Sequence, residues 1–115
     1  MIIATTPYVG GSRVSETKGQ VFGLVVRSRG LAGNLAAGLR SLVGGEIHEY
    51  TSLLEDTRRQ AIDRMVQNAT LMGANAVISM RFDSSEMANT MTEIVAYGTA
   101  VTVQPDSAAR QPATE

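Results

Sequence analysis

Residues 52–78, SLLEDTRRQAIDRMVQNATLMGANAVI, determine how the rest of the chain can be arranged. Apolar and small side chains recur here every three or four residues, so they share one face of a helix. They are Leu54, Ala61, Ile62, Met65, Ala69 and Met72. Gly73 follows and predicts a left-handed helix end, and residues 74–78 then become β-like. A helix that leads directly into a buried strand predicts a helix packed on a sheet.

The start of this helix has two candidate positions. Ser52 and Glu55 match a capping box, in which each side chain satisfies a backbone N–H group of the first turn. Glu55 and Asp56 also place negative charge where the helix dipole favours it. The alternative is an earlier start, near Glu46.

Strands are expected on both sides of this helix, at residues 1–6, 13–28, 74–83 and 93–103. The second could instead be two strands, broken near Lys18 and Gly19. Its residues 21–26 are apolar on both faces, so we expect them to be central in the sheet. Gly23 indicates a bend or a close backbone approach. Residues 84–92 are expected to form a polar loop.

A further helix is expected at residues 31–43, where leucines share one face and small residues permit close packing. Gly44 and Gly45 separate it from the second helix. The pattern therefore predicts one α+β domain, residues 1–103, with two helices and an antiparallel or mixed sheet. Residues 104–115 are rich in Ala, Pro, Ser, Thr and Gln and are expected to form a disordered tail.

Composition excludes several functions. The chain has 10 basic and 11 acidic residues, a balance that argues against nucleic acid or an anionic membrane as partner. It has no cysteine, so it forms no disulfide and no thiolate metal site. Its apolar runs are far shorter than the roughly 20 residues of a membrane span. Cytoplasm is therefore the expected location.

Several segments together resemble one protein family. They are Thr5-Thr6-Pro7, Ala37-Gly38-Leu39-Arg40, Val43-Gly44-Gly45, Tyr50 with Arg58 eight residues later, Met72 to Ile78, Arg81 to Glu86 and Tyr97 to Val101. In this order and spacing they are similar to the YbjQ-like proteins, a small bacterial family labelled "putative heavy-metal-binding". The resemblance covers roughly residues 2–103. It implies a two-layer α/β domain and a closed homopentamer, but no defined activity.

A candidate anion-binding site surrounds the double glycine. Its residues are Arg40, Gly44, Gly45, Tyr50 and Arg58. Glycine N–H groups, a helix N-terminus and two guanidinium groups could together hold an anion. Arg58 carries the strongest indication, because a charged residue on an apolar helix face needs a partner. The alternative partner is a carboxylate of the same or a neighbouring subunit, from Glu46, Glu49 or Glu93.

A metal site would use the single histidine. His48 has Glu46 and Glu49 as carboxylate neighbours, and a ring would repeat this set in every subunit. One imidazole with carboxylates makes at best a weak site, since a structural zinc site normally has four N or S ligands. A solvated loop or helix start is the alternative interpretation.

Three functions remain open from the sequence. The first is a non-enzymatic ring that binds a small ligand or anion in a central channel or in clefts between subunits. The second is a metal-binding or metal-buffering ring. The third is an enzyme with a site shared between subunits, although no cysteine is present and His48 lacks the spacing of a catalytic triad. No cofactor motif is found, and no cofactor is expected.

We predict that the chain binds no heavy metal tightly. Soft metals prefer thiolates, which are absent, and ordering a glycine-flanked segment around His48 subtracts from affinity. Elemental analysis of untagged protein, dialysed with zinc, copper or nickel, should find well under one ion per chain. A stoichiometric ion that disappears in His48→Ala would instead favour the metal-binding ring.

Overall fold

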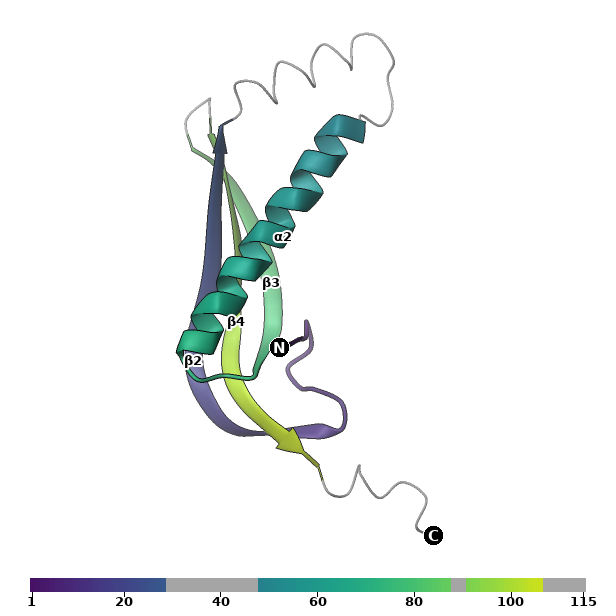
Figure 1. Ribbon diagram of the computed structural model, residues 1–115, viewed down its shortest axis with the longest axis vertical. Helices are drawn as coiled ribbons and strands as arrows, with labels where there is room; N and C mark the ends of the chain where they lie inside the picture. Colours follow the sequence, from purple (N-terminus) through teal and green to yellow (C-terminus); the bar gives the residue numbers. More distant parts are fainter. Residues whose placement is uncertain (29–47, 88–90, 107–115) are drawn as a thin grey trace.

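The computed structural model describes residues 1–28, 48–87 and 91–106. Within these ranges, one helix lies across one face of a four-stranded sheet (Figure 1). The strands are β1 (Ile2–Ile3), β2 (Ser12–Ser28), β3 (Ala76–Met87) and β4 (Met91–Pro105), and the helix is α2 (His48–Leu71). The α+β prediction is confirmed, but this part of the chain holds one helix. The helix predicted at residues 31–43 falls outside it.

The sheet is mixed, with the strand order β1-β3-β4-β2. β1 runs parallel to β3, whereas β3 and β2 both run antiparallel to β4. β2 therefore lies at an edge, and the prediction that residues 21–26 are central is wrong. Val21 and Val25 are buried beneath α2, while the alternate side chains point to the opposite face and stay exposed. The exposed side chains are Phe22 (51%), Leu24 (37%) and Val26 (45%).

α2 begins earlier than the capping box indicated. It starts at His48, so Ser52 and Glu55 lie inside the helix and the alternative of an earlier start is the better prediction. The end is as predicted: Gly73 has a φ of 82°. The N–H groups of Gly73 and Ala74 donate to the carbonyls of Thr70 and Ala69, which is the Schellman pattern. No helix in the described ranges has the length and apolar content needed to cross a membrane.

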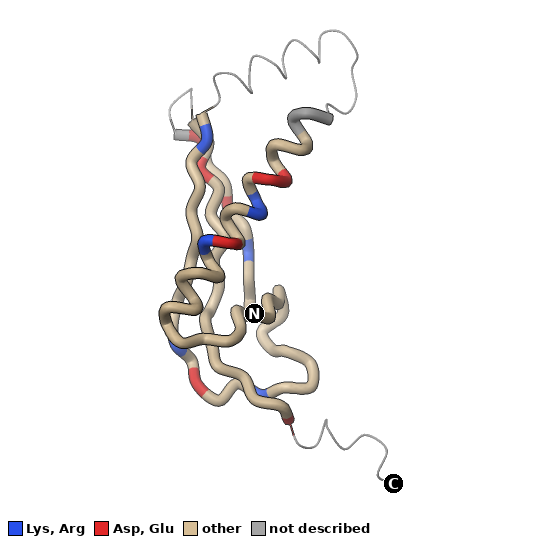
Figure 2. The backbone as a smooth tube through the Cα atoms, viewed as in Figure 1, with Lys and Arg blue, Asp and Glu red and all other residues tan. Residues whose placement is uncertain are grey.

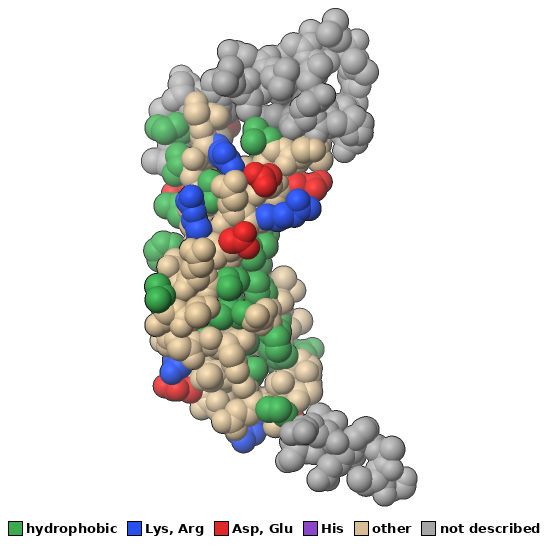
Figure 3. Space-filling view, viewed as in Figure 1, with side chains coloured by type: hydrophobic (Ala, Val, Ile, Leu, Met, Phe, Trp, Pro, Cys, Tyr) green, Lys and Arg blue, Asp and Glu red, His purple; other side chains and the backbone are tan. Residues whose placement is uncertain are grey.

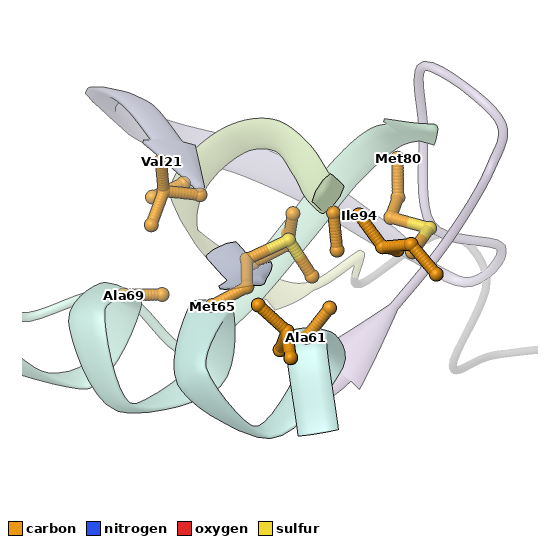
Figure 4. Packing of buried hydrophobic residues seen from close by; sticks show 10 residues of the cluster. Val21, Ala61, Met65, Ala69, Met80 and Ile94 are labelled. Atoms are coloured by element: carbon orange, nitrogen blue, oxygen red, sulfur yellow. The ribbon is translucent and has the colours of Figure 1, made fainter. Parts of the chain in front are cut away.

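The core lies between α2 and the sheet. Ala61, Met65 and Ala69 of α2 are fully buried and pack against strand residues such as Val21 and Ile94 (Figure 4). This confirms the predicted apolar face of the helix, although Leu54, one of its members, remains 39% exposed. The helix is therefore held to the sheet mainly by its C-terminal two-thirds.

Gly23 is the point of closest approach between β2 and α2. A Cβ atom added to Gly23 would clash with the backbone carbonyl of Ala61 and the backbone nitrogen of Met65. The close backbone approach predicted for this glycine is thus confirmed. Because both obstacles are backbone atoms of a helix, no side-chain movement could relieve the clash.

Polar side chains of α2 also hold the helix to the edge strand. The Arg64 guanidinium donates to the Leu24 carbonyl at 2.6 Å, and the Asn68 amide donates to the Phe22 carbonyl at 2.8 Å. At the end of β2, Arg27 Nε donates to the hydroxyl of buried Thr57 at 3.2 Å. Hydrogen bonds and close packing therefore act on the same pair of elements.

The β3–β4 hairpin is longer than predicted. Residues 84–87 and 91–92 belong to its strands, which pair as far as Met87 opposite Met91, so the predicted polar loop at residues 84–92 is largely wrong. The strands also extend past the other predicted boundary, because Pro105 pairs with Ser12. Only residues 107–115 of the predicted tail lie outside the described ranges. The strand was missed at residues 84–86 because these residues are all polar and lack the alternation of apolar and polar side chains that predicts a strand.

A bulge interrupts β3 between Ile78 and Arg81. Ser79 adopts a φ of 53° there, and its N–H group donates to the Thr6 carbonyl at 2.9 Å. Met80 donates in the same way to Ala4 at 3.0 Å. The N-terminal segment, which was predicted as a strand over residues 1–6, is thus a two-residue strand continued by backbone hydrogen bonds to the bulge.

We predict that Gly23→Ala lowers the free energy of unfolding by about 3 kcal/mol, because the new methyl group must displace the backbone of α2. Gly10→Ala is the matched control, since nothing lies within 4 Å of the added Cβ, and it should stay within about 0.5 kcal/mol. Urea unfolding measures both. Similar midpoints for the two variants would mean that α2 does not rest on Gly23.

Candidate functional site

The N-terminal half of α2 diverges from the strands (Figure 1). Arg58 belongs to this half and lines two hollows together with residues of β3 and β4. Arg58 lies one turn before Ala61 and Ile62, on the face of α2 that turns toward the sheet. Its guanidinium carbon lies 4.9 Å from the centroid of the Phe82 ring on β3. This is a cation–π contact, which attracts the cation to the ring without neutralising its charge.

Two adjoining hollows meet at Arg58. The larger has a volume of about 360 Å³ and is lined by Thr51, Leu54, Glu55, Arg58, Ser84, Thr92 and Ile94. The smaller has a volume of about 200 Å³ and is lined by Arg58, Phe82, Asp83, Ser84 and Ile94. Both hollows share Arg58, Ser84 and Ile94. We call the pair the Arg58 cleft.

Charged residues of α2 are grouped in the middle of the helix, and its last turns carry none (Figure 2). Over this region the acidic and basic side chains lie side by side (Figure 3). Arg59 pairs with Glu55 at 3.6 Å, and Arg27 pairs with Asp56 at 3.5 Å. Arg58 differs, because no carboxylate among the described side chains lies within ion-pair distance of it.

Three carboxylates were expected as ion-pair partners of Arg58, within the chain or from a neighbouring subunit. Glu93 is described, and it accepts a hydrogen bond from the Ser85 hydroxyl at 3.1 Å rather than pairing with Arg58. Glu46 lies outside the described residues, and the side chain of Glu49 is not described. Phe82 is therefore the partner that the described structure gives to Arg58.

The other predicted site residues remain untested. Arg40, Gly44, Gly45 and Glu46 fall outside the described residues. His48, Glu49 and Tyr50 form the first turn of α2, and only their backbone is described. In the described ranges no group of three or more His, Cys, Asp or Glu side chains is placed to hold a metal.

The residues that line the cleft from the strands were not predicted as site residues from the sequence. Phe82, Ser84, Thr92 and Ile94 line it from β3 and β4, but residues 84–92 were interpreted as a loop tip. Ser84 lies directly opposite Ile94 in the hairpin register. The available signal was the alternation of Phe82 and Ser84 on one side of an extended segment, which indicates a shared sheet face.

The fold and site define a small α+β domain with one mixed sheet, one described helix and a cleft containing an arginine. Residues 1–104 match the family described as "Putative heavy-metal-binding". The chain belongs to this family, the YbjQ-like proteins, as its resemblance implied.

Curated relatives agree with this assignment. A UPF0145 protein of Bradyrhizobium sp. (strain ORS 278) is 62% identical over 105 residues, covering 91% of this chain and 95% of the relative. One from the archaeon Methanoregula boonei is 55% identical over 112 residues, covering 97% and 93%. Another, from the archaeon Picrophilus torridus, is 57% identical over 105 residues, covering 91% and 89%. The family is therefore not confined to bacteria.

A solved structure supports the fold alone. A crystal structure of a protein with unknown function from Pediococcus pentosaceus superimposes with a TM-score of 0.59 at 16% identity. It covers 90% of this chain and 98% of that one. At this identity the likeness extends to the chain path and says nothing about the residues of the cleft.

Arg58→Ala should destabilise the protein more than Arg59→Ala. The first removes the cation–π contact with Phe82, worth about 0.5–1 kcal/mol at exposed sites. The second removes an exposed i,i+4 pair, worth about 0.3–0.5 kcal/mol. Urea unfolding of both variants measures the difference.

A double-mutant cycle identifies the contact responsible. Arg58→Ala in a Phe82→Leu background should cost less than in the natural chain, because the ring is already absent. Equal costs in the two backgrounds would show that Arg58 stabilises the fold through some other group.

Proposed function

We propose that this chain is a non-enzymatic, oligomeric protein that binds a small ligand through an anionic group at the Arg58 cleft. The observation that carries this is the state of Arg58: its guanidinium contacts an aromatic ring, lines two hollows and has no carboxylate partner among the described side chains. A guanidinium group held in this way keeps its N–H donors available for a bidentate acceptor.

The size of the cleft suits a small molecule. Its larger hollow, about 360 Å³, is within the range of known small-ligand pockets, roughly 300–1,000 Å³. The lining also has the usual composition, with a few polar groups among apolar ones. Thr51, Ser84 and Thr92, which carry hydroxyl groups, line the same hollow as Arg58.

Binding without catalysis is the better interpretation of the lining. The described residues around both hollows include hydroxyl groups and the acidic residues Glu55 and Asp83, but no histidine, lysine or cysteine. A serine or threonine needs an adjacent base to act as a nucleophile. The Asp83 carboxylate accepts the Ser84 backbone N–H at 2.9 Å, which is a local strand contact and not a contact with a hydroxyl nucleophile.

Assembly is supported by exposed apolar side chains on the face of the sheet opposite α2. Phe22, Leu24 and Val26 of β2 are exposed there, and Tyr97 of β4 lies directly opposite Phe22. Apolar patches of this kind mark interaction sites in soluble proteins. We propose that a second copy of the chain covers this face, in a ring of the kind the family resemblance implies.

The proposed function predicts that anion binding depends on Arg58. Isothermal titration calorimetry of the full chain with acetate, sulfate and inorganic phosphate, at constant ionic strength, should detect saturable binding of at least one anion. Arg58→Gln should weaken it at least tenfold, because the charged donors are lost.

Arg59→Gln is the matched control, since Arg59 is the next residue, pairs with Glu55 and does not line either hollow. An equal loss of anion affinity in both variants would show that the anion responds to the net charge of the protein and not to a site at Arg58.

Light scattering of the same samples should report particles of several 12.2 kDa chains. Particles of a single chain would contradict the assembly.

A further inference from the structure

The lining of the larger hollow is both polar and apolar. Arg58 and Ser84 are among its polar members, while Leu54 of α2 and Ile94 of β4 are its apolar ones. Ile94 is only 5% exposed and belongs to the core, so its position is fixed. Leu54 is the least buried member of the apolar helix face and extends beyond the core. A ligand that contacts both the polar and the apolar residues of the lining needs an anionic head and a hydrocarbon body.

The charges near Arg58 favour a head with a single negative charge. Glu55 is among the residues that line the larger hollow, and Asp83 is among those that line the smaller. Arg59 offsets Glu55 through its ion pair at 3.6 Å. No basic side chain other than Arg58 lines either hollow in the described residues. Near Glu55, a doubly charged phosphate would be repelled more strongly than a single carboxylate would be.

Geometry supports the same head group. A carboxylate is planar and matches the fork of a guanidinium in two parallel N–H···O bonds. The Phe82 ring lies against the guanidinium, and stacking on an aromatic ring leaves N–H groups at the guanidinium edge free to donate in its own plane. Ser84 lines both hollows, and a serine hydroxyl can donate a further hydrogen bond to a carboxylate.

We infer that the ligand of the Arg58 cleft is a monocarboxylic acid with a short aliphatic chain. Its carboxylate is held by Arg58 and Ser84, and its chain lies between Leu54 and Ile94. This inference rests on the proposed function, because it names the class of anion that the same cleft would bind. It involves no covalent step, and the acid leaves the cleft unchanged.

Chain length provides the test. Isothermal titration calorimetry of the full chain with acetate, butyrate, hexanoate and inorganic phosphate should give affinities that rise about two- to fourfold for each added methylene group, as expected for burial of part or all of that group. Phosphate should bind more weakly than butyrate. Arg58→Gln should weaken all three acids by a similar factor, because they share the head group.

Leu54→Gln separates the body of the ligand from its head. It should leave acetate binding within twofold of the natural chain and flatten the rise from acetate to hexanoate. Leu71→Gln is the matched control, because Leu71 is on the same helix, is 85% exposed and does not line the cleft. In this variant the increase in affinity from acetate to hexanoate should be the same as in the natural protein. Titration of the unsubstituted protein is enough to show whether affinity depends on the length of the acid's aliphatic chain.

The outcomes separate the two proposals. Arg58-dependent binding of phosphate as tight as that of hexanoate, or equal affinity for acetate and hexanoate, would overturn the monocarboxylate while leaving an anion site in place. No saturable binding of any of the four probes would overturn the anion site itself. A rise with chain length that persists in Leu54→Gln would place the hydrocarbon elsewhere and overturn the proposed arrangement.

Discussion

The absence of a side chain at Gly23 allows α2 to lie directly on β2, and the positions of the other elements follow from this contact. The backbone of the helix at Ala61 and Met65 occupies the space that a Cβ atom would need. With the helix so close, Arg64 and Asn68 reach carbonyl groups of the edge strand. The contact lies under the middle of α2, so the N-terminal turns continue past the core. Arg58 lies one turn before Ala61 and contacts Phe82 of β3.

Features set by local chemistry could be predicted from the sequence. The apolar face of α2, the left-handed end at Gly73 and the close approach at Gly23 each depend on a few neighbouring residues. The fold class also followed, because a helix that leads into a branched apolar segment has few ways to bury both. The position of β2 within the sheet could not be predicted from the sequence. Residues 21–26 are apolar on both faces, and the same pattern fits a central strand or an edge strand with an uncovered face.

The candidate site was predictable only in part, because it is made by contacts between distant segments. Arg58 could be identified from its place on an apolar helix face. Its contact with Phe82 depends on the angle of the helix and the length of the β3–β4 hairpin, which no local pattern determines. The polar residues 84–86 resemble a loop, although in the structure they are strand residues. Among the described side chains the contact found for Arg58 is aromatic, and the ion pairs with Glu46 and Glu49 stay a prediction.

The hydrogen bonds from α2 to the edge of the sheet have a consequence for solubility. An uncovered edge strand offers carbonyl and N–H groups to strands of other molecules, and long apolar edges promote aggregation. At Phe22 and Leu24 the carbonyls already accept hydrogen bonds from Asn68 and Arg64. An incoming strand would have to displace both donors before it could pair there. The most apolar part of β2 is thus protected against fibril-like strand addition, while the side chains on its outer face remain free to contact other surfaces.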